Sequence, residues 1–126
     1  PKLKSDLITI ILACIEGKLA EIKIDWSHKK SLCVVLCSNG YPDNYEKNIV
    51  IDNLSKLDID DDNFIFHAGT IKNKNQILSI GGRVLNFISI SDDFLLARNN
   101  IHKNIEKLNW DKGFYRKDIA FKVINK

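Results

Sequence analysis

Three consecutive residues, Gly81, Gly82 and Arg83, have the clearest potential for chemistry in this sequence. Because glycine has no side chain, backbone N–H groups at such a pair can converge on an anion, and a ligand can approach closely. An adjoining arginine can hold two phosphate or carboxylate oxygens at once. A β-bulge followed by a surface arginine would explain the same triplet without a ligand. The triplet alone leaves both interpretations open.

A second polar segment contains His67, Gly69 and Thr70. A histidine at the end of a strand, next to a glycine turn and a threonine hydroxyl, can line a polar site. No serine or cysteine nucleophile stands nearby in the sequence, and no carboxylate is placed to orient the ring. A structural histidine that is hydrogen-bonded to the backbone is an equally open interpretation.

Two further places could contact a ligand. Tyr41 and Pro42 belong to a dense cluster of turn residues, where the Tyr41 ring could face a ligand or cap the core. Lys2 and Lys4 precede Ser5, at which we expect a helix to begin, and free N–H groups at a helix N-terminus attract anions. Ordinary helix capping is the alternative explanation there.

The hydrophobic pattern predicts the elements that position these residues. We expect a helix over 7–15, with Ser5 as its N-cap and Gly17 after its end. Apolar residues occupy most of the circumference of this helix, which predicts that it is well buried. An alternating strand over 22–26 and a continuous, buried strand over 31–38 should follow.

The second half of the chain predicts a hairpin and a long helix. The stretch 53–63 is polar and acidic, so we expect it to be a solvated loop. A calcium-binding loop is not predicted, because the glycine and the final glutamate of such a loop are missing. The remaining expected elements, in chain order, are a strand over 64–70, a hairpin with its tip at 72–75 and its return strand at 76–80, a strand over 83–90, a helix capped by 91–93 that ends near Asn109, and a docked extended tail over 110–124. This order predicts an α+β domain with antiparallel strands.

Composition narrows the class of protein. The 126 residues suit one domain, and a net charge of +3 is too mild to indicate a nucleic-acid binder. The sequence contains no run of about eighteen apolar residues, so it predicts no membrane span. Because the chain starts at Pro1 and contains no methionine, we interpret it as a piece of a longer polypeptide. The three cysteines lack a metal-binding pattern and are expected to be free, buried thiols in a reducing compartment, which favours the cytoplasm.

Five segments in one order carry a family resemblance that covers nearly the whole chain. They are 1–7 (PKLKSDL), 34–42 (VVLCSNGYP), 66–70 (FHAGT), 81–85 (GGRVL) and 114–119 (FYRKDI). Together they resemble the C-terminal domain of the phosphoribosylamine–glycine ligases, which are ATP-grasp enzymes also called glycinamide ribonucleotide synthetases.

The resemblance implies a function for the longer polypeptide. Such a ligase joins glycine to 5-phosphoribosylamine in de novo purine synthesis, using ATP and Mg²⁺ or Mn²⁺. Residues 1–126 would form its C-terminal domain, a small antiparallel, barrel-like unit that packs on the ATP-grasp domain and closes the substrate cleft. The ATP-grasp and N-terminal domains would be missing from this chain, with most of the ATP and metal contacts, so the chain alone should be inactive.

The resemblance also implies roles for single residues. Arg83, with the backbone of Gly81 and Gly82, would hold the ribosyl 5-phosphate, and Lys4 would add charge. The residues expected to line or shape the cleft are His67, Gly69, Thr70, Tyr41 and Pro42. Arg116 and Asp118 are expected to anchor the tail.

The sequence departs from the family pattern at Asp43, Asn48 and Ala120, where the family tends to have glycine. These changes suggest a differently shaped loop after Pro42 and leave the Gly-Gly-Arg segment intact. A non-enzymatic antiparallel module that binds a ligand or another protein is the alternative function.

Overall fold

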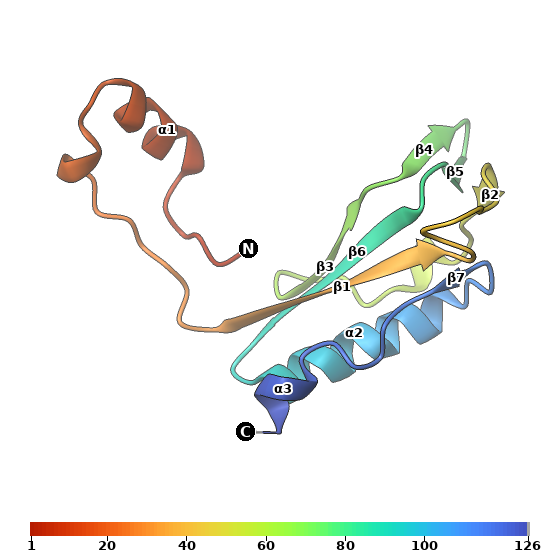
Figure 1. Ribbon diagram of the computed structural model, residues 1–126. Coiled ribbons are helices and arrows are strands. Elements are labelled where there is room, and N and C mark those ends of the chain that lie inside the picture. The colour runs from red at the N-terminus through yellow and green to blue at the C-terminus, as the bar shows by residue number, and fades with distance from the viewer. Residues whose placement is uncertain (126) are drawn as a thin grey trace.

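The computed structural model describes residues 1–125. The chain forms an α+β fold in which helices and antiparallel strands follow one another (Figure 1). The elements are α1 (Leu7–Ile15), the 3-10 helix η1 (Leu19–Glu21), β1 (Lys30–Ser38), β2 (Ile49–Val50), the 3-10 helix η2 (Leu54–Lys56), β3 (Asn63–His67), β4 (Thr70–Asn73), β5 (Gln76–Ser79), β6 (Arg83–Ser91), α2 (Phe94–Leu108), β7 (Gly113–Phe114) and α3 (Phe121–Ile124).

The strands form two antiparallel sheets. The larger sheet has the order β3-β6-β1-β7, and the smaller one has the order β2-β5-β4. In the larger sheet β1 and β6 run side by side with Val34 opposite Phe87. The expected α+β class and antiparallel pairing are therefore confirmed. Within residues 1–125 the sheets remain open and do not close into a barrel.

Helix α2 covers one face of the larger sheet and forms the core with it (Figure 1). Because side chains alternate across a strand, Val34 and Leu36 of β1 point toward the helix, while Cys33 and Val35 point away. The strand expected at 31–38 is thus present but buried on one face only. The core residues are Leu32, Val34, Leu36, Ile51, Leu57, Val84, Leu85, Phe87, Ala97, Ile101, Ile105 and Leu108.

The ends of α2 follow the expected signals. A carboxylate oxygen of Asp93 accepts a hydrogen bond from the N–H of Leu96 at 2.7 Å, which caps the helix N-terminus. Asn109 ends the helix in the left-handed conformation with φ of 48°. The predicted boundaries of this helix are confirmed.

The expected hairpin is formed by β4 and β5, and two glycines join it to the larger sheet. The N–H of Gly69 donates to Arg83 O at 2.8 Å, and the N–H of Gly81 donates to Gly69 O at 3.2 Å. A Cβ on Gly69 would lie 2.6 Å from the Gly81 Cα, so the two backbones can cross only because side chains are absent. The hairpin leaves the larger sheet at this crossing and pairs with β2 in the smaller one.

Helix α1 has the predicted bounds, but the expectation that it is well buried is wrong. Only Ala13 is buried, whereas Ile8 is 63% exposed and Ile15 is 76% exposed. The helix contacts η1 and stands apart from the sheets in Figure 1. The expected N-cap is also off by one residue, since Asp6 accepts the hydrogen bond from the N–H of Thr9 at 2.7 Å.

The predicted strand over 22–26 is wrong. This segment forms one isolated bridge, between Leu3 and Trp26, and the N–H of Lys4 donates to Asp25 O at 2.9 Å. The alternating pattern is present, but no strand of either sheet lies alongside it. Residues 1–29, which we call the N-terminal arm, therefore lead into β1 without joining a sheet.

Three smaller expectations have mixed outcomes. The acidic loop contains η2 and is tied to α2 by salt bridges from Asp58 to Lys103 and Lys107. The tail docks as expected through β7, which pairs with β1, but the short helix α3 was not predicted. All three cysteines are free; Cys14 and Cys33 are exposed and Cys37 is half-buried, so the expected burial is wrong.

In the described part of the chain, no helix combines the length and apolar character that crossing a membrane requires.

Candidate functional site

The glycine crossing brings together most of the residues proposed as a site. Gly69 lies against Gly81, and Arg83 follows at the start of β6. On the other side of the turn, Nδ1 of His67 and Oγ1 of Thr70 form a hydrogen bond of 3.0 Å. The imidazole and hydroxyl groups thus lie next to each other, and His67 is exposed to solvent. We call Gly69, His67, Thr70 and the triplet 81–83 the corner cluster.

Tyr41 joins this cluster through its ring. A Cβ on Gly82 would lie 2.0 Å from Cδ2 of Tyr41, so the ring lies directly on the glycine backbone. The backbone N–H of Ser38 donates to Gly82 O at 2.8 Å, and its hydroxyl donates to Gly81 O at 3.0 Å. The end of β1 therefore holds the glycine pair on one side while Tyr41 covers it.

The backbone donors of the glycine pair are less free than the sequence suggested. The N–H of Gly81 is already paired with Gly69 O, and Gly82 is buried. The register of β1 and β6 shifts between Leu36 and Cys37, which pairs Cys37 with Arg83 and leaves a β-bulge. The bulge that we considered as an alternative is therefore present. An anion at this place would therefore be bound mainly by the side chain of Arg83.

Arg83 is an exposed cation at the edge of this cluster. None of the salt bridges within residues 1–125 involves it. Burial raises the pKa of the opposite Cys37 thiol, and the positive charge of Arg83 counteracts this rise. The guanidinium is therefore close to the end of β1 and available for an incoming anion.

Lys4 is not placed with the corner cluster. It belongs to the N-terminal arm, which enters β1 at Lys30, whereas Gly82 is bonded to Ser38 at the opposite end of that strand. Eight residue steps along a strand span about 26 Å. Figure 1 also shows the arm on the other side of the picture from the β4–β5 hairpin.

Pro42 follows Tyr41 through a cis peptide bond and lines a cavity of about 380 Å³. The walls of this cavity are mostly apolar and include Cys33, Cys37 and Phe114. Arg116 also borders it, while its guanidinium pairs with both carboxylate oxygens of Asp118 at 3.0 and 2.6 Å. These two tail residues thus bind each other on the surface.

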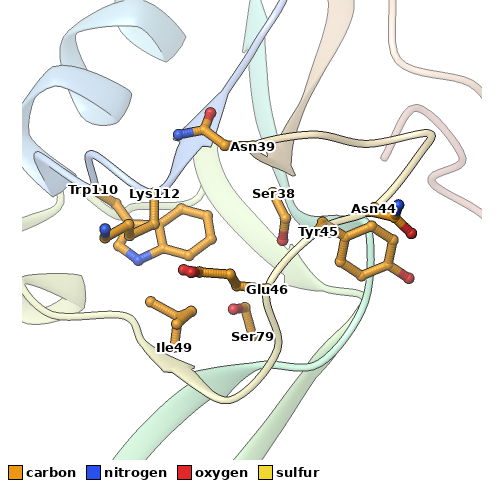
Figure 2. A pocket seen from close by; sticks show the side chains of 9 residues that line it. All are labelled: Ser38, Asn39, Asn44, Tyr45, Glu46, Ile49, Ser79, Trp110 and Lys112. Carbon is orange, nitrogen blue, oxygen red and sulfur yellow. The ribbon is translucent and has the colours of Figure 1, made fainter.

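A second cavity, which sequence reasoning missed, is lined in part by Ser38 at the end of β1 (Figure 2). Its volume is about 410 Å³. Its walls come from the end of β1, the loop before β2, the end of β5 and the turn after α2. The chemistry-bearing residues there, Glu46, Ser79, Trp110 and Lys112, belong to no motif, so no local sequence signal could have joined them.

Among residues 1–125, no group of three or more histidine, cysteine, aspartate or glutamate side chains is arranged to hold a metal ion. The acidic side chains of the loop after η2 are used locally. Asp60 accepts hydrogen bonds from the N–H groups of Asp62 and Asn63, and these bonds lower the pKa of its carboxyl group, most of all the bond from Asp62.

Comparison with known proteins identifies relatives. The family described as phosphoribosylglycinamide synthetase, C domain, matches residues 31–122. The bifunctional purine biosynthetic protein purD of Dictyostelium discoideum is 44% identical over 99% of this chain and 16% of its own length. The phosphoribosylamine–glycine ligase of Caldanaerobacter subterraneus is 39% identical over 95% of this chain and 28% of its own.

A solved structure agrees with these matches. The crystal structure of phosphoribosylamine–glycine ligase from Thermotoga maritima superposes with a TM-score of 0.66 and 26% identity, over 87% of this chain and 27% of that one. The chain therefore spans less than a third of the length of these relatives. Since the family match covers most of the chain and contains the whole corner cluster, the chain belongs to the phosphoribosylglycinamide synthetase C-domain family.

Proposed function

We propose that this chain is the C-terminal part of an ATP-dependent ligase that joins glycine to 5-phosphoribosylamine in purine biosynthesis. The family match over residues 31–122 carries the proposal, and relatives named as this ligase support it. The alternative of a non-enzymatic module is not favoured, because these relatives are named as enzymes.

In this proposal the corner cluster forms the wall of the domain that closes the substrate cleft. Arg83 binds the 5-phosphate of phosphoribosylamine, because its guanidinium is exposed and forms no salt bridge within the described residues. His67 and Thr70 add hydrogen-bonding groups beside it. Tyr41 and Pro42 keep the wall rigid, since the tyrosine ring lies on Gly82.

ATP and Mg²⁺ or Mn²⁺ would be bound mainly by the rest of the polypeptide. The described residues offer no cluster of metal ligands, so they do not fit the metal ion. The proposal assigns ATP and metal binding to ATP-grasp and N-terminal domains outside this chain, where ATP would supply the energy for forming the carbon–nitrogen bond. The chain alone is then inactive. Its free thiols favour the reducing cytoplasm.

Two apolar surfaces support packing against a larger polypeptide. The first is the outside of α1, where Ile8 and Ile15 are exposed. The second is the face of the larger sheet opposite α2, where Phe66 is 52% exposed and meets the Phe64 ring edge to face with ring centroids 5.3 Å apart. Exposed apolar surfaces of this kind mark interaction sites. The relatives have more than two thirds of their length outside the match, which is enough to cover both surfaces.

The change Arg83→Ala in the full-length enzyme tests the phosphate role. We expect the KM for phosphoribosylamine to rise about thirtyfold or more, because a charge-assisted hydrogen bond in a closed cleft contributes about 2–3 kcal/mol. The KM for ATP should stay nearly constant. Steady-state kinetics with each substrate varied in turn measures both values.

The change Lys74→Ala provides the matched control. Lys74 is an exposed cation at the tip of the β4–β5 hairpin, outside the corner cluster, and its loss should leave both KM values unchanged. If Arg83→Ala raises the two KM values equally, the arginine does not bind the phosphate. If the full-length protein forms no glycinamide ribonucleotide at all, the proposed reaction itself is wrong.

A further inference from the structure

The cavity between β1, β5 and the turn after α2 contains a buried polar group without a partner. Ser79 is 0% exposed, and its hydroxyl oxygen forms no hydrogen bond within residues 1–125. The neighbouring Ser38 is also buried, but its hydroxyl donates to Gly81 O. A buried hydroxyl without a partner destabilises a protein, because it has lost its hydrogen bonds to water and gained none in return. A ligand or solvent in this cavity would supply the missing bond.

Trp110 gives the cavity a rigid aromatic wall. Its indole N–H donates to Val50 O at 3.0 Å, and the ring packs on Gly113, where a Cβ would lie 2.6 Å from the ring. These two contacts fix the orientation of the ring in the cavity wall. A preorganised indole in a cavity of about 410 Å³ suits a flat aromatic ligand.

Two charged side chains complete the cavity. Figure 2 shows the carboxylate of Glu46 directed toward the side of the cavity where Trp110 lies. Lys112 also lines the cavity and is held in the turn, where its carbonyl oxygen accepts the N–H of Asn39 at 2.9 Å. Neither charge takes part in a salt bridge among the described residues. One wall can thus accept two N–H groups while another can pair with an anion.

We propose that this cavity binds a purine nucleotide whose base carries an amino group next to a ring N–H, as guanine does. The base stacks on Trp110, the Glu46 carboxylate accepts the two N–H donors, and the Lys112 ammonium pairs with the phosphate. Ser79 hydrogen-bonds to the base edge inside the cavity. Adenine is disfavoured, because its unprotonated ring nitrogen would face the carboxylate. This site goes beyond the proposed ligase function and does not depend on it.

Tryptophan fluorescence of the 126-residue chain tests this site directly. The chain has two tryptophans, and Trp26 is exposed on the N-terminal arm, so Trp26→Phe leaves Trp110 as the only emitter. We expect saturable quenching by GMP. AMP should bind roughly tenfold more weakly or worse, since it lacks the paired donors that a carboxylate accepts. CMP should bind still more weakly, because its smaller ring stacks less.

Three substitutions in the Trp26→Phe background locate the ligand. Glu46→Gln should weaken GMP binding roughly tenfold, because a carboxylate acceptor is replaced by an amide. Ser79→Ala should weaken binding without lowering the unfolding midpoint, since its hydroxyl has no partner to lose. Asp111→Asn is the control, because it removes a nearby exposed negative charge outside the cavity.

The outcomes are decisive in either direction. Tighter binding of GMP than of AMP, lost in Glu46→Gln and kept in Asp111→Asn, supports the site. Absence of quenching by GMP, equal affinity for GMP and AMP, or full affinity in Glu46→Gln overturns it. Circular dichroism of each variant shows that the chain is folded, so that a lost signal reports the site.

Discussion

The ring of Tyr41 lies directly over the backbone of Gly82, and a Cβ on that glycine would be 2.0 Å from the ring. Gly82→Ala should therefore force the ring to move and destabilise the chain by about 1–3 kcal/mol, as overpacking of a closed contact does. Urea denaturation of the chain measures the change. Its free energy of unfolding should fall while the m-value stays constant.

A double-mutant cycle with Tyr41→Ala identifies the clash as the cause. Once the ring is removed, Gly82→Ala meets no obstacle, so the double variant should be more stable than the sum of the single effects implies. Additive effects would show that Gly82 is required for another reason. This contact also explains why a glycine stands here, since φ of Gly82 is not positive.

The crossing of Gly69 and Gly81 predicts a ranking of two substitutions. A Cβ on Gly69 would lie 2.6 Å from the Gly81 Cα and 2.7 Å from Arg83 O, whereas the nearest atom to a Cβ on Gly81 would be 3.0 Å away. Both obstacles to Gly69→Ala are backbone atoms and cannot rotate away. Gly69→Ala should lower the thermal unfolding midpoint more than Gly81→Ala does. The reverse order would contradict the crossing geometry.

The strand β1 and the helix α2 could be predicted because their signals are local. The continuous apolar run over 31–38 specifies a strand, and Asp93 and Asn109 mark the two ends of α2 with capping chemistry that needs no tertiary partner. The same logic located the hairpin between Thr70 and Ser79. These elements agree with the sequence because short-range and long-range preferences coincide in them.

The features that the sequence did not reveal depend on partners. The periodicity of α1 shows that the helix has apolar sides, but it cannot show whether this chain covers them. The segment 22–26 alternates like a strand yet has no neighbour to pair with. Trp110, Glu46 and Ser79 meet only after four segments have packed, so their cavity follows from the tertiary fold alone.

His102 predicts how stability depends on pH. Its imidazole packs against the tilted ring of Tyr115 with ring centroids 5.3 Å apart, and its Nε2 is buried without a partner within residues 1–125. Burial lowers its pKa below the ordinary 6.5, and the positive charges of Arg98 and Lys117 act in the same direction, against Glu106. The unfolded chain therefore takes up this proton at a higher pH than the folded one does.

The stability that the neutral ring contributes is thus complete above pH 6.5 and is lost as the pH falls below that value toward the lower folded-state pKa. The urea concentration at the unfolding midpoint of the chain should therefore fall as the pH is lowered from about 7.5 to about 5.5. His102→Gln should flatten this decrease. The exposed His28 offers the control, since His28→Gln should keep the full slope. Equal slopes for both variants would exclude His102 as the source.

Helix α1 predicts a difference between the 126-residue chain and the full-length protein. Leu12 and Ile15 are 52% and 76% exposed, so changing them to Glu and Lys removes little buried surface from this chain. The double variant should bind less hydrophobic dye and keep the unfolding free energy within about 0.5 kcal/mol. In the full-length protein, where we propose that α1 is covered, the same change should destabilise by about 3 kcal/mol or more, because two buried apolar side chains are lost.

Exchanging Glu16 and Lys18 is the matched control for this comparison. These residues lie just beyond α1 and pair with each other at 2.9 Å, so the exchange keeps the ion pair and should be neutral in both proteins. Parallel urea denaturation of the two proteins measures each difference. If Leu12→Glu with Ile15→Lys is as harmless in the full-length protein as in the chain, α1 remains in solvent there, and its apolar surface does not bind the rest of the polypeptide.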